Sequence, residues 1–251
     1  MSDHTADAVA TRAALEGLLA DAPAIATALP AGFGDAAQGF VAMLLEANAR
    51  INLTRVTEPE AVARLHLLDS LVALPLLDAW EPAAAIDLGS GGGLPAIPLA
   101  LARPGMAWTL VDSVGKKAAA LDAFVEALGI RNITVVADRA EALGRDPRHR
   151  ERYGVVTARA CAPLPVLVEL ALPFLSIGGS LLAWKGPAGE PDDEVRRGRV
   201  AAGQLGGGRL EIVGTGLPSL GGHRFVVVPK ERPTPAAYPR RPGEPGRRPL
   251  G

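Results

Sequence analysis

The residues best suited to chemistry lie in residues 84–93, where a short apolar run ends in an acid and alternating glycines. Asp87 is followed by Gly89, Gly91 and Gly93. An apolar run that stops at glycines and then resumes predicts a buried parallel strand, a tight turn and a helix. Glycines let the backbone of such a turn approach a ligand closely, and the following helix directs unpaired N–H groups at it. We therefore expect a ligand site at this turn.

The spacing narrows the class of ligand. Dinucleotide sites use Gly-x-Gly-x-x-Gly, whereas this turn has Gly-x-Gly-x-Gly, and the hydroxyl-and-lysine pair of a nucleoside-triphosphate P-loop is absent. The preceding acid favours a ligand with a cationic end, such as S-adenosylmethionine, which carries an ammonium and a sulfonium. The next predicted strand ends at Asp112, from where a carboxylate can accept hydrogen bonds from ribose hydroxyls. The alternative is a glycine turn in an unrelated α/β domain, with Asp112 capping the next helix.

Three later strand ends also carry polar residues. The third predicted strand leads into Arg139, Ala140 and Glu141, where a backbone N–H and a carboxylate can recognise adenine. Arg159 follows the fourth strand and Lys185 follows the fifth. Because the carboxyl ends of parallel strands meet at one edge of a sheet, these two cations suit an anionic substrate or a base edge. The alternative is that both are solvated charges.

The elements that must position these residues alternate between strand and helix from residue 84 onward, as a doubly wound α/β sheet requires. Strands are predicted near 84–88, 107–112, 132–136, 153–158 and 179–184, followed by an antiparallel pair at 209–214 and 223–229. Helices are predicted near 94–102, 115–128, 139–144 and 164–175, with a charged loop at 145–152 and a charged, glycine-rich excursion at 189–208. Five parallel strands and a closing hairpin are the layout of Rossmann-like methyltransferases.

Residues 1–82 are predicted to form a helical extension beside the first strand. An alanine-rich helix is expected at 11–28, and an amphipathic helix should end near Asn48. Residues 57–60 have the pattern of a capping box, which should open a helix that runs to about Pro75.

His66, Asp69 and Ser70 fall on one face of that last helix. They are either a histidine satisfied by a neighbouring carboxylate or a polar face at a substrate entrance. None of the four histidines has metal-ligand spacing to another, and the single cysteine, Cys161, follows an apolar strand. We therefore expect no metal site.

Composition limits the class of protein. The chain has 251 residues, 48% of them apolar, which is enough for one α/β domain plus an extension. A single cysteine allows no internal disulfide. The first residues have neither a basic start nor an apolar core, and no stretch is apolar enough to span a membrane. We expect a soluble cytoplasmic protein.

The tail, residues 231–251, differs from the rest of the chain. The overall formal charge is −1, yet residues 229–251 hold six Lys or Arg against two Glu, together with seven prolines. Such a segment is expected to be extended and solvated rather than packed. A basic arm of this kind often follows a phosphate backbone. The alternative is a tail that only improves solubility.

Seven short blocks are more specific than any single motif. They are Asn52-Leu-Thr54, Leu65-His-Leu-Leu-Asp-Ser70, Asp87-Leu-Gly-Ser-Gly-Gly-Gly-Leu-Pro95, Thr109-Leu-Val-Asp-Ser113, Arg139-Ala-Glu141, Thr157-Ala-Arg-Ala160 and Trp184-Lys-Gly186. With the basic ending at 238–250, this ordered set resembles the RsmG family, also called GidB, over about residues 40–250. The family's members use S-adenosylmethionine to methylate N7 of one guanine, position 527 in standard numbering, of bacterial 16S ribosomal RNA.

The resemblance implies a Rossmann-like class I methyltransferase fold, with a mostly parallel seven-stranded sheet, helices on both faces and an antiparallel C-terminal hairpin. Residues 1–82 would be the helical extension, 83–230 the methyltransferase domain and 231–251 the tail. The resemblance and the strand-end pattern together imply a set of residues that bind the cofactor. These are Asp87, Gly89, Gly91, Leu94, Asp112, Ser113, Ala140, Glu141 and Arg159. The candidates toward RNA are Arg64, His66, Arg139, Lys185, Arg240 and Arg241, with Arg159 and Lys185 able to position the substrate. The expected partner is 16S ribosomal RNA or the small ribosomal subunit, without metal or membrane, and the chain is expected to be a monomer.

Two positions depart from the family pattern. Members usually have a basic residue directly before the histidine, whereas here Leu65 stands there and Arg64 is displaced by one position. Cys161 replaces a residue that is commonly small and apolar, and we interpret it as a packing residue.

The sparse set of candidates agrees with the implied reaction. Guanine N7 has a free lone pair and no proton, so its attack on a sulfonium methyl requires alignment rather than a general base. The major groove of A-form RNA is too deep and narrow to reach, so the target should be unpaired. Other hypotheses are a nicotinamide-dependent oxidoreductase, a non-catalytic RNA-binding protein, and a methyltransferase acting on another RNA or a small molecule.

Overall fold

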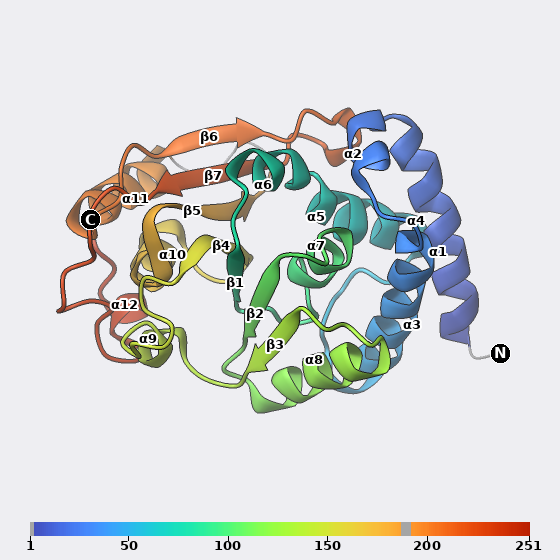
Figure 1. Cartoon of the computed structure of the whole chain (residues 1–251), viewed down its shortest axis with the longest axis horizontal. Coiled ribbons are helices and arrows are strands. Elements are labelled where there is room, and N and C mark those ends of the chain that lie inside the picture. The colour runs from blue at the N-terminus through green and yellow to red at the C-terminus, as the bar shows by residue number, and fades with distance from the viewer. Residues whose placement is uncertain (1–2, 187–191) are drawn as a thin grey trace.

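A seven-stranded sheet forms the centre of the molecule, which we describe from a computed structural model covering residues 3–186 and 192–251 (Figure 1). The strands are β1 Ala84–Leu88, β2 Ala107–Val111, β3 Ile133–Val136, β4 Tyr153–Arg159, β5 Leu175–Lys185, β6 Glu211–Gly214 and β7 Arg224–Pro229. Their order is β3-β2-β1-β4-β5-β7-β6. β1 to β5 are parallel, and β7 runs antiparallel to both β5 and β6. The predicted fold class is confirmed.

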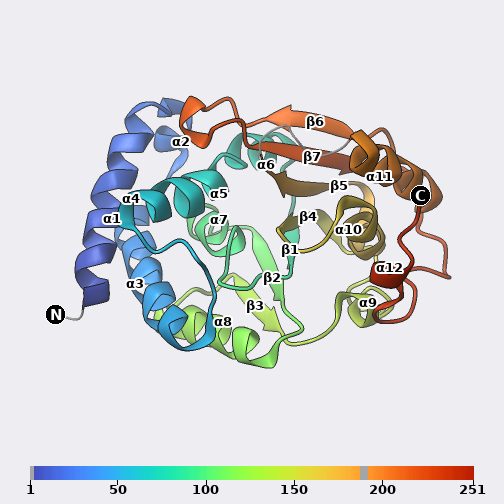
Figure 2. The ribbon, with the colours of Figure 1, turned by 180° about the vertical axis from the view of Figure 1, so that it is seen from behind.

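Helices cover both faces of the sheet (Figures 1 and 2). The N-terminal part contains α1 Asp3–Ala20, α2 Pro23–Ala28, α3 Phe33–Ile51, α4 Pro59–Val62, a π-helical turn Ala63–Leu68, α5 Asp69–Leu71 and α6 Leu74–Trp80. The rest contains α7 Ala96–Ala102, α8 Gly115–Ala127, α9 Ala140–Leu143, α10 Leu164–Ala171, α11 Asp192–Gln204, α12 Glu244–Arg247 and 3-10 turns at Leu172–Phe174 and Pro218–Leu220. Among these described helices, none is long and apolar enough to cross a membrane.

Two buried apolar clusters lie on opposite faces of the sheet. Alternate residues of β1 divide between them, since Ala85 belongs to one cluster and Ile86 to the other. The first cluster joins the N-terminal helices, α7 and α8 to the sheet, and the second joins α10 and α11 to it. The helical extension therefore packs as part of the core, and it holds the elements that border the carboxyl ends of the strands.

Several predicted boundaries were wrong for local reasons. The helix expected at 11–28 is interrupted, because α1 ends at Ala20 and α2 begins at Pro23. The expected capping box does not form, since the residue that caps α4 is Glu58, without a side-chain hydrogen bond. The excursion at 189–208 contains α11, while its residues 189–191 lie outside the described part of the chain. α11 packs closely on α10: a Cβ added at Gly198 would lie 2.6 Å from Leu164 Cδ2.

The tail contradicts the expectation of an extended, solvated arm. It folds back against the domain and contains the short helix α12, beside α9 and α10 (Figure 2). Thr234, Pro239 and Pro245 are buried. Composition was misleading here because Arg240 pairs with the buried Glu169, and because Arg145 and Arg150 of the domain donate to carbonyls of the proline-rich stretch.

Candidate active site

The glycine turn after β1 has the backbone conformation that its sequence predicts. Gly89, Gly91 and Gly93 all have positive φ, at +69°, +54° and +87°, values that other residues rarely adopt. Gly89 is also needed for a close approach, because a Cβ there would lie 2.9 Å from Cys161 Sγ. The N–H groups of Gly89 and Ser90 donate to the carbonyl of Val111 at the end of β2. The turn is therefore fixed against the neighbouring strand.

Asp112 links this turn to the loop after β2. Its Oδ2 accepts the N–H of Gly91 (2.9 Å), and its Oδ1 accepts the N–H of Val114 (2.8 Å), which precedes α8. The carboxylate therefore binds the start of the next helix and also lines a cavity beside the turn. Each carboxylate oxygen has a second lone pair, so these bonds leave acceptor capacity for the hydroxyls of a ligand.

The cavity beside the turn has a volume of about 360 Å³, within the range of small-molecule and cofactor sites. It lies at the carboxyl ends of β1, β2 and β3, where open α/β sheets bind ligands. The predicted residues that line it are Gly89, Asp112, Ser113, Arg139, Ala140 and Glu141. Sequence reasoning missed Lys117, Cys161 and three tail residues, Gly243, Pro245 and Gly246. Asp87, Gly91, Leu94 and Arg159 are not among the lining residues, and Leu94 is buried.

Asp87 is a buried carboxylate with one unsatisfied oxygen. Thr157, its partner in the register of β1 and β4, donates a hydrogen bond from Oγ1 to Oδ1 (2.6 Å). Among the described residues, Oδ2 has no hydrogen-bond partner. Burial raises the pKa of Asp87 to about 7, against the hydrogen bond from Thr157, which lowers it. An orphaned buried oxygen at the glycine turn fits a ligand that brings a donor or a cation.

A second cavity, of about 230 Å³, adjoins the first at the ends of β4 and β5. The two cavities share a wall formed by the three residues after β4, which are Ala160, Cys161 and Ala162. Ala160 has a positive φ of 53°. The other lining residues are Asp69, Ala158, Arg159, Leu167, Trp184, Lys185, Gly186 and His223. The structure thus places two predicted substrate-side cations, Arg159 and Lys185, in one cavity.

Asp69 holds the wall of this second cavity together. Its Oδ2 accepts from Arg159 (3.1 Å), its Oδ1 lies 2.8 Å from Nδ1 of His223, and its carbonyl accepts the indole N–H of Trp184 (2.7 Å). Arg159 also donates to the carbonyl of Leu65 (2.8 Å). Residues from β4, from β5 and from the loop before β7 therefore meet at Asp69, which belongs to the helical extension. His223 was missed because its loop has no pattern that indicates a partner.

The predicted pairing of His66 with a carboxylate was wrong. Nε2 of His66 instead lies 2.7 Å from Thr54 Oγ1, and Ser70 donates to the His66 carbonyl (2.6 Å). The prediction assumed α-helical spacing, whereas Ala63–Leu68 forms a π-helical turn. Burial, followed by the charge of Arg159, lowers the pKa of His66 to about 4. His66 is therefore a buried neutral residue, and its Nδ1 lies 3.5 Å from Nη2 of Arg159.

Most of the other predicted RNA residues have partners within the protein. Lys185 forms an ion pair with Glu194 (2.7 Å). Arg139 pairs with Glu141 (2.6 Å), although half of its side chain stays exposed. The side chains of Arg159 and Lys185 are only 18% and 11% exposed, so they are not freely solvated charges.

The two tail arginines and Arg64 differ in their surroundings. Arg240 is paired with the buried Glu169, while its neighbour Arg241 is exposed. Arg64 donates a long hydrogen bond to the carbonyl of Ser219 (3.4 Å). One cation missed by sequence reasoning is Arg224, which lies opposite Lys185 in the register of β5 and β7. Among the described residues, its Nε is buried and has no hydrogen-bond partner.

The described residues contain no group of three or more His, Cys, Asp or Glu arranged to hold a metal ion.

Comparison with known proteins identifies the family. The family model GidB, described as rRNA small subunit methyltransferase G, matches residues 35–213. The ribosomal RNA small subunit methyltransferase G of Roseiflexus castenholzii is 49% identical over 204 residues, covering 81% of this chain and 86% of the relative. The protein of the same name from Deinococcus deserti is 47% identical over 209 residues, covering 83% and 85%.

Solved structures agree on the fold. The S-adenosylmethionine-dependent methyltransferase SibL, in its apo form, has a TM-score of 0.53 at 16% identity and covers 80% of this chain and 77% of that one. The O-methyltransferase TomG of Streptomyces achromogenes, solved with S-adenosylmethionine, has a TM-score of 0.52 at 16% identity, with coverages of 77% and 90%. The chain therefore belongs to the GidB family, and it is an S-adenosylmethionine-dependent methyltransferase of small-subunit ribosomal RNA.

Proposed function

We propose that this protein transfers the methyl group of S-adenosylmethionine to N7 of one guanine in 16S ribosomal RNA. The observation that carries the proposal is the pair of adjoining cavities at the carboxyl ends of the strands, separated by residues 160–162. In a methyl transfer the donor and the acceptor must lie in contact and in line. Two cavities that share one short wall provide one place for the methyl donor and a neighbouring place for the acceptor.

The first cavity is the proposed cofactor site. When bound, S-adenosylmethionine supplies an electrophilic methyl group on a sulfonium. Asp112 and Ser113 would bind the ribose, with the backbone and side chain of Ala140 and Glu141 toward the adenine. Asp87 is buried beside the glycine turn and does not line this cavity, so its orphaned Oδ2 would accept a hydrogen bond from an ammonium end that extends past the turn. The glycine turn holds these groups in place because Gly91 is bonded to Asp112.

The second cavity is the proposed acceptor site. A flipped-out guanine needs a flat slot with fixed donors, and Arg159 is fixed there by Asp69 and by the carbonyl of Leu65. N7 carries no proton, so the protein need only orient the base and tolerate the positive charge that develops on it. No general base is required. The target must be unpaired, because N7 in an A-form helix lies in a groove that side chains cannot enter.

Two cations beside this cavity, Lys185 and Arg224, would bind the RNA backbone, while Arg159 orients the base. Arg159, Lys185 and Arg224 belong to three neighbouring strands, β4, β5 and β7, and lie at one edge of the sheet. Arginine and lysine on such an edge can contact phosphates without reading sequence. The protein would therefore bind RNA through a few cations near the target base rather than through a large basic surface. A formal charge of only −1 for the whole chain agrees with this.

The monomer expected as the working unit remains a prediction. We place the protein in the cytoplasm, where small ribosomal subunits are found, and propose that its partner is the small subunit or its RNA. The division at residues 82 and 230 describes sequence segments, since the extension and the tail both pack on the central domain.

The test is transfer of a labelled methyl group to 16S ribosomal RNA from cells that lack this protein. Reduction followed by aniline treatment releases N7-methylguanine and breaks the RNA chain there, so the expected result is one cleavage site that appears only after methyl transfer. Label at another atom or on another RNA would contradict the proposal. Binding of S-adenosylhomocysteine without transfer would indicate a non-catalytic RNA-binding protein, and a thermal shift with NAD alone would indicate an oxidoreductase; either result would overturn the proposal.

A further inference from the structure

We infer that the tail, residues 231–251, forms one wall of the cofactor cavity, so that cofactor binding and ordering of the tail are coupled. This inference rests on the proposed function in taking the first cavity as the cofactor site. It concerns a segment that lies beyond residues 35–213, which the family model matches. It replaces the expectation of a free RNA-binding arm.

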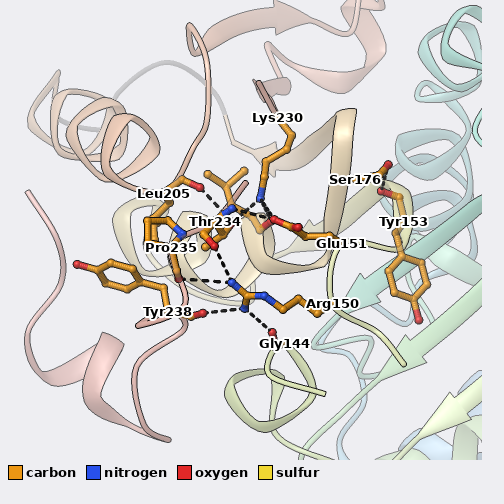
Figure 3. Close-up of polar contacts among 11 residues, drawn as sticks. Gly144, Arg150, Glu151, Tyr153, Ser176, Leu205, Lys230, Thr234, Pro235 and Tyr238 are labelled. Carbon is orange, nitrogen blue, oxygen red and sulfur yellow. Dashed lines mark hydrogen bonds and ion pairs between the residues drawn. The ribbon is translucent and has the colours of Figure 1, made fainter. Parts of the chain in front are cut away.

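The first attachment of the tail is a buried lysine at the end of β7 (Figure 3). Nζ of Lys230 donates to the carbonyl of Leu172 (2.6 Å) and to the hydroxyl of Thr234, and it lies 3.4 Å from Glu151. Thr234 in turn donates its N–H to Glu151 (2.8 Å) and its hydroxyl to the carbonyl of Leu205 (3.1 Å). A buried ammonium with these partners fixes the point where the tail leaves the sheet.

The second attachment explains the charged loop at 145–152. Arg150 donates to the carbonyls of Thr234 and Tyr238, each at 2.8 Å, and to that of Gly144 (2.9 Å) (Figure 3). Arg145 donates to the carbonyls of Ala237 (2.9 Å) and Pro239 (2.8 Å). Two guanidinium groups therefore hold the backbone of a proline-rich segment whose prolines have no N–H of their own to donate.

The third attachment is an ion pair with the core. Glu169 of α10 is completely buried, and it accepts from both the backbone N–H (2.9 Å) and Nε (2.8 Å) of Arg240. Arg240 has a side chain only 18% exposed, whereas Arg241 is exposed. A buried carboxylate needs such a partner, because removal of the partner would leave an uncompensated charge. Arg240 thus binds a residue of the domain, and its guanidinium is not free to bind RNA.

The attached tail then reaches the cavity itself. The N–H of Gly243 donates to Oε1 of Glu141 (2.8 Å), one of the lining residues on the adenine side. Gly243, Pro245 and Gly246 line the same cavity. Release of the tail would remove these groups and open the cavity to water. If a ligand binds only when the tail closes the cavity, its binding shifts the tail toward the ordered state. The free energy needed to order the tail is then subtracted from the free energy of ligand binding.

Arg240→Ala, with Arg241→Ala as a matched control, tests this inference in the full-length chain. Cys161 is the only cysteine and lines the cavity, so its alkylation rate reports opening without any cofactor. We expect Arg240→Ala to speed alkylation and to weaken S-adenosylhomocysteine binding about tenfold, because ordering the tail would then oppose binding. Arg241→Ala should change neither. Equal rates and affinities for wild type and Arg240→Ala would overturn the inference.

Two further measurements test the inference even if Arg240→Ala does not fold. The double variant Arg240→Gln with Glu169→Gln leaves no unpaired buried charge and should show the same two effects. In the wild type, S-adenosylhomocysteine should slow amide hydrogen exchange in residues 240–251 but not in α1, and unchanged exchange in the tail would overturn the coupling. One result separates this inference from the proposed function. If the wild type binds no S-adenosylhomocysteine but Cys161 is alkylated faster in Arg240→Ala, the tail forms a wall of the cavity and the cavity is not the cofactor site.

Discussion

The carboxylate of Asp112 accepts the backbone N–H of Gly91 at 2.9 Å, so the loops after β2 and β1 form one unit. The second oxygen of Asp112 accepts the N–H of Val114. Since Gly91 has a positive φ, the turn places its N–H where other residues would be strained. One acidic side chain thus shapes the turn and also borders the proposed ribose site.

Asp112→Asn is expected to weaken S-adenosylhomocysteine binding about tenfold or more. An amide can accept at only one of its two ends, so either Gly91 or Val114 loses its acceptor and meets a second donor. The same loss should lower the free energy of unfolding by about 1–3 kcal/mol. Isothermal titration and thermal melting measure both. Asp122→Asn, at an exposed position of α8, is the control, and equal affinities for the two variants would contradict the assignment.

Asp87 should make both stability and cofactor binding depend on pH. Burial raises its pKa from 3.8 to about 7 in the folded protein. The folded state therefore holds a proton that the unfolded state loses, so the contribution of Asp87 to stability falls as pH rises from about 4 to 7. The ammonium group of S-adenosylhomocysteine favours the ionised form of Asp87, so the affinity for this ligand should rise as pH increases to about 7 and then level off.

Asp87→Asn provides the control for this pH dependence. The variant cannot ionise, so its affinity for S-adenosylhomocysteine should be nearly constant between about pH 6 and 8, and lower than that of the wild type at the upper end. The charged groups that act on Asp87 are Arg159 and Asp112, and both remain in the variant. Parallel pH profiles for the variant and the wild type would show that Asp87 does not meet the ligand.

Asp69→Asn should separate methyl transfer from cofactor binding. Asp69 positions Arg159 and His223 in the second cavity, and it does not line the first. An amide would hold one of the two partners and release the other, and we expect kcat to fall about tenfold or more through misalignment. Affinity for S-adenosylhomocysteine should stay within about twofold. Single-turnover kinetics and calorimetry measure the two effects. A parallel loss of both would mean that Asp69 only stabilises the fold.

Arg224→Met should weaken RNA binding and leave the cofactor site intact. The substitution keeps an apolar stem but removes the guanidinium, whose Nε has no partner among the described residues. Loss of one phosphate contact should reduce the slope of log affinity against log salt by about one. Filter binding of 16S ribosomal RNA over a salt series measures this slope. Arg131→Met, at an exposed position before β3, is the control, and identical slopes for both variants would contradict the proposed RNA edge.

The central site could be predicted from sequence because its determinants are local. Asp87 and the three glycines lie at and after the carboxyl end of β1, and Asp112 directly follows β2. Parallel strands bring their carboxyl ends to one edge of the sheet whatever the rest of the chain does. The alternation of strand and helix gave the order of elements for the same reason. Boundaries were less certain, and β5 begins at Leu175 rather than near residue 179, because the 3-10 turn before it shortens α10.

The parts that sequence could not show depend on partners far apart in the chain. The basic, proline-rich composition of the tail is the same whether its arginines are solvated or, like Arg240, paired with a buried carboxylate. His223 and Asp69 are 154 positions apart in the sequence, and the helical spacing of Asp69 points to His66 rather than to His223. His66 was misassigned because a single π-helical turn rotates its face.

The most direct test of the account is the alkylation rate of Cys161 in the wild-type protein, measured with and without S-adenosylhomocysteine. Cys161 lies in the wall shared by both cavities, so a ligand in the first cavity should shield it. We predict that saturating S-adenosylhomocysteine slows the reaction about tenfold, whereas NAD at the same concentration leaves it unchanged. An unchanged rate under conditions where calorimetry shows that S-adenosylhomocysteine is bound would place the cofactor elsewhere and contradict the account.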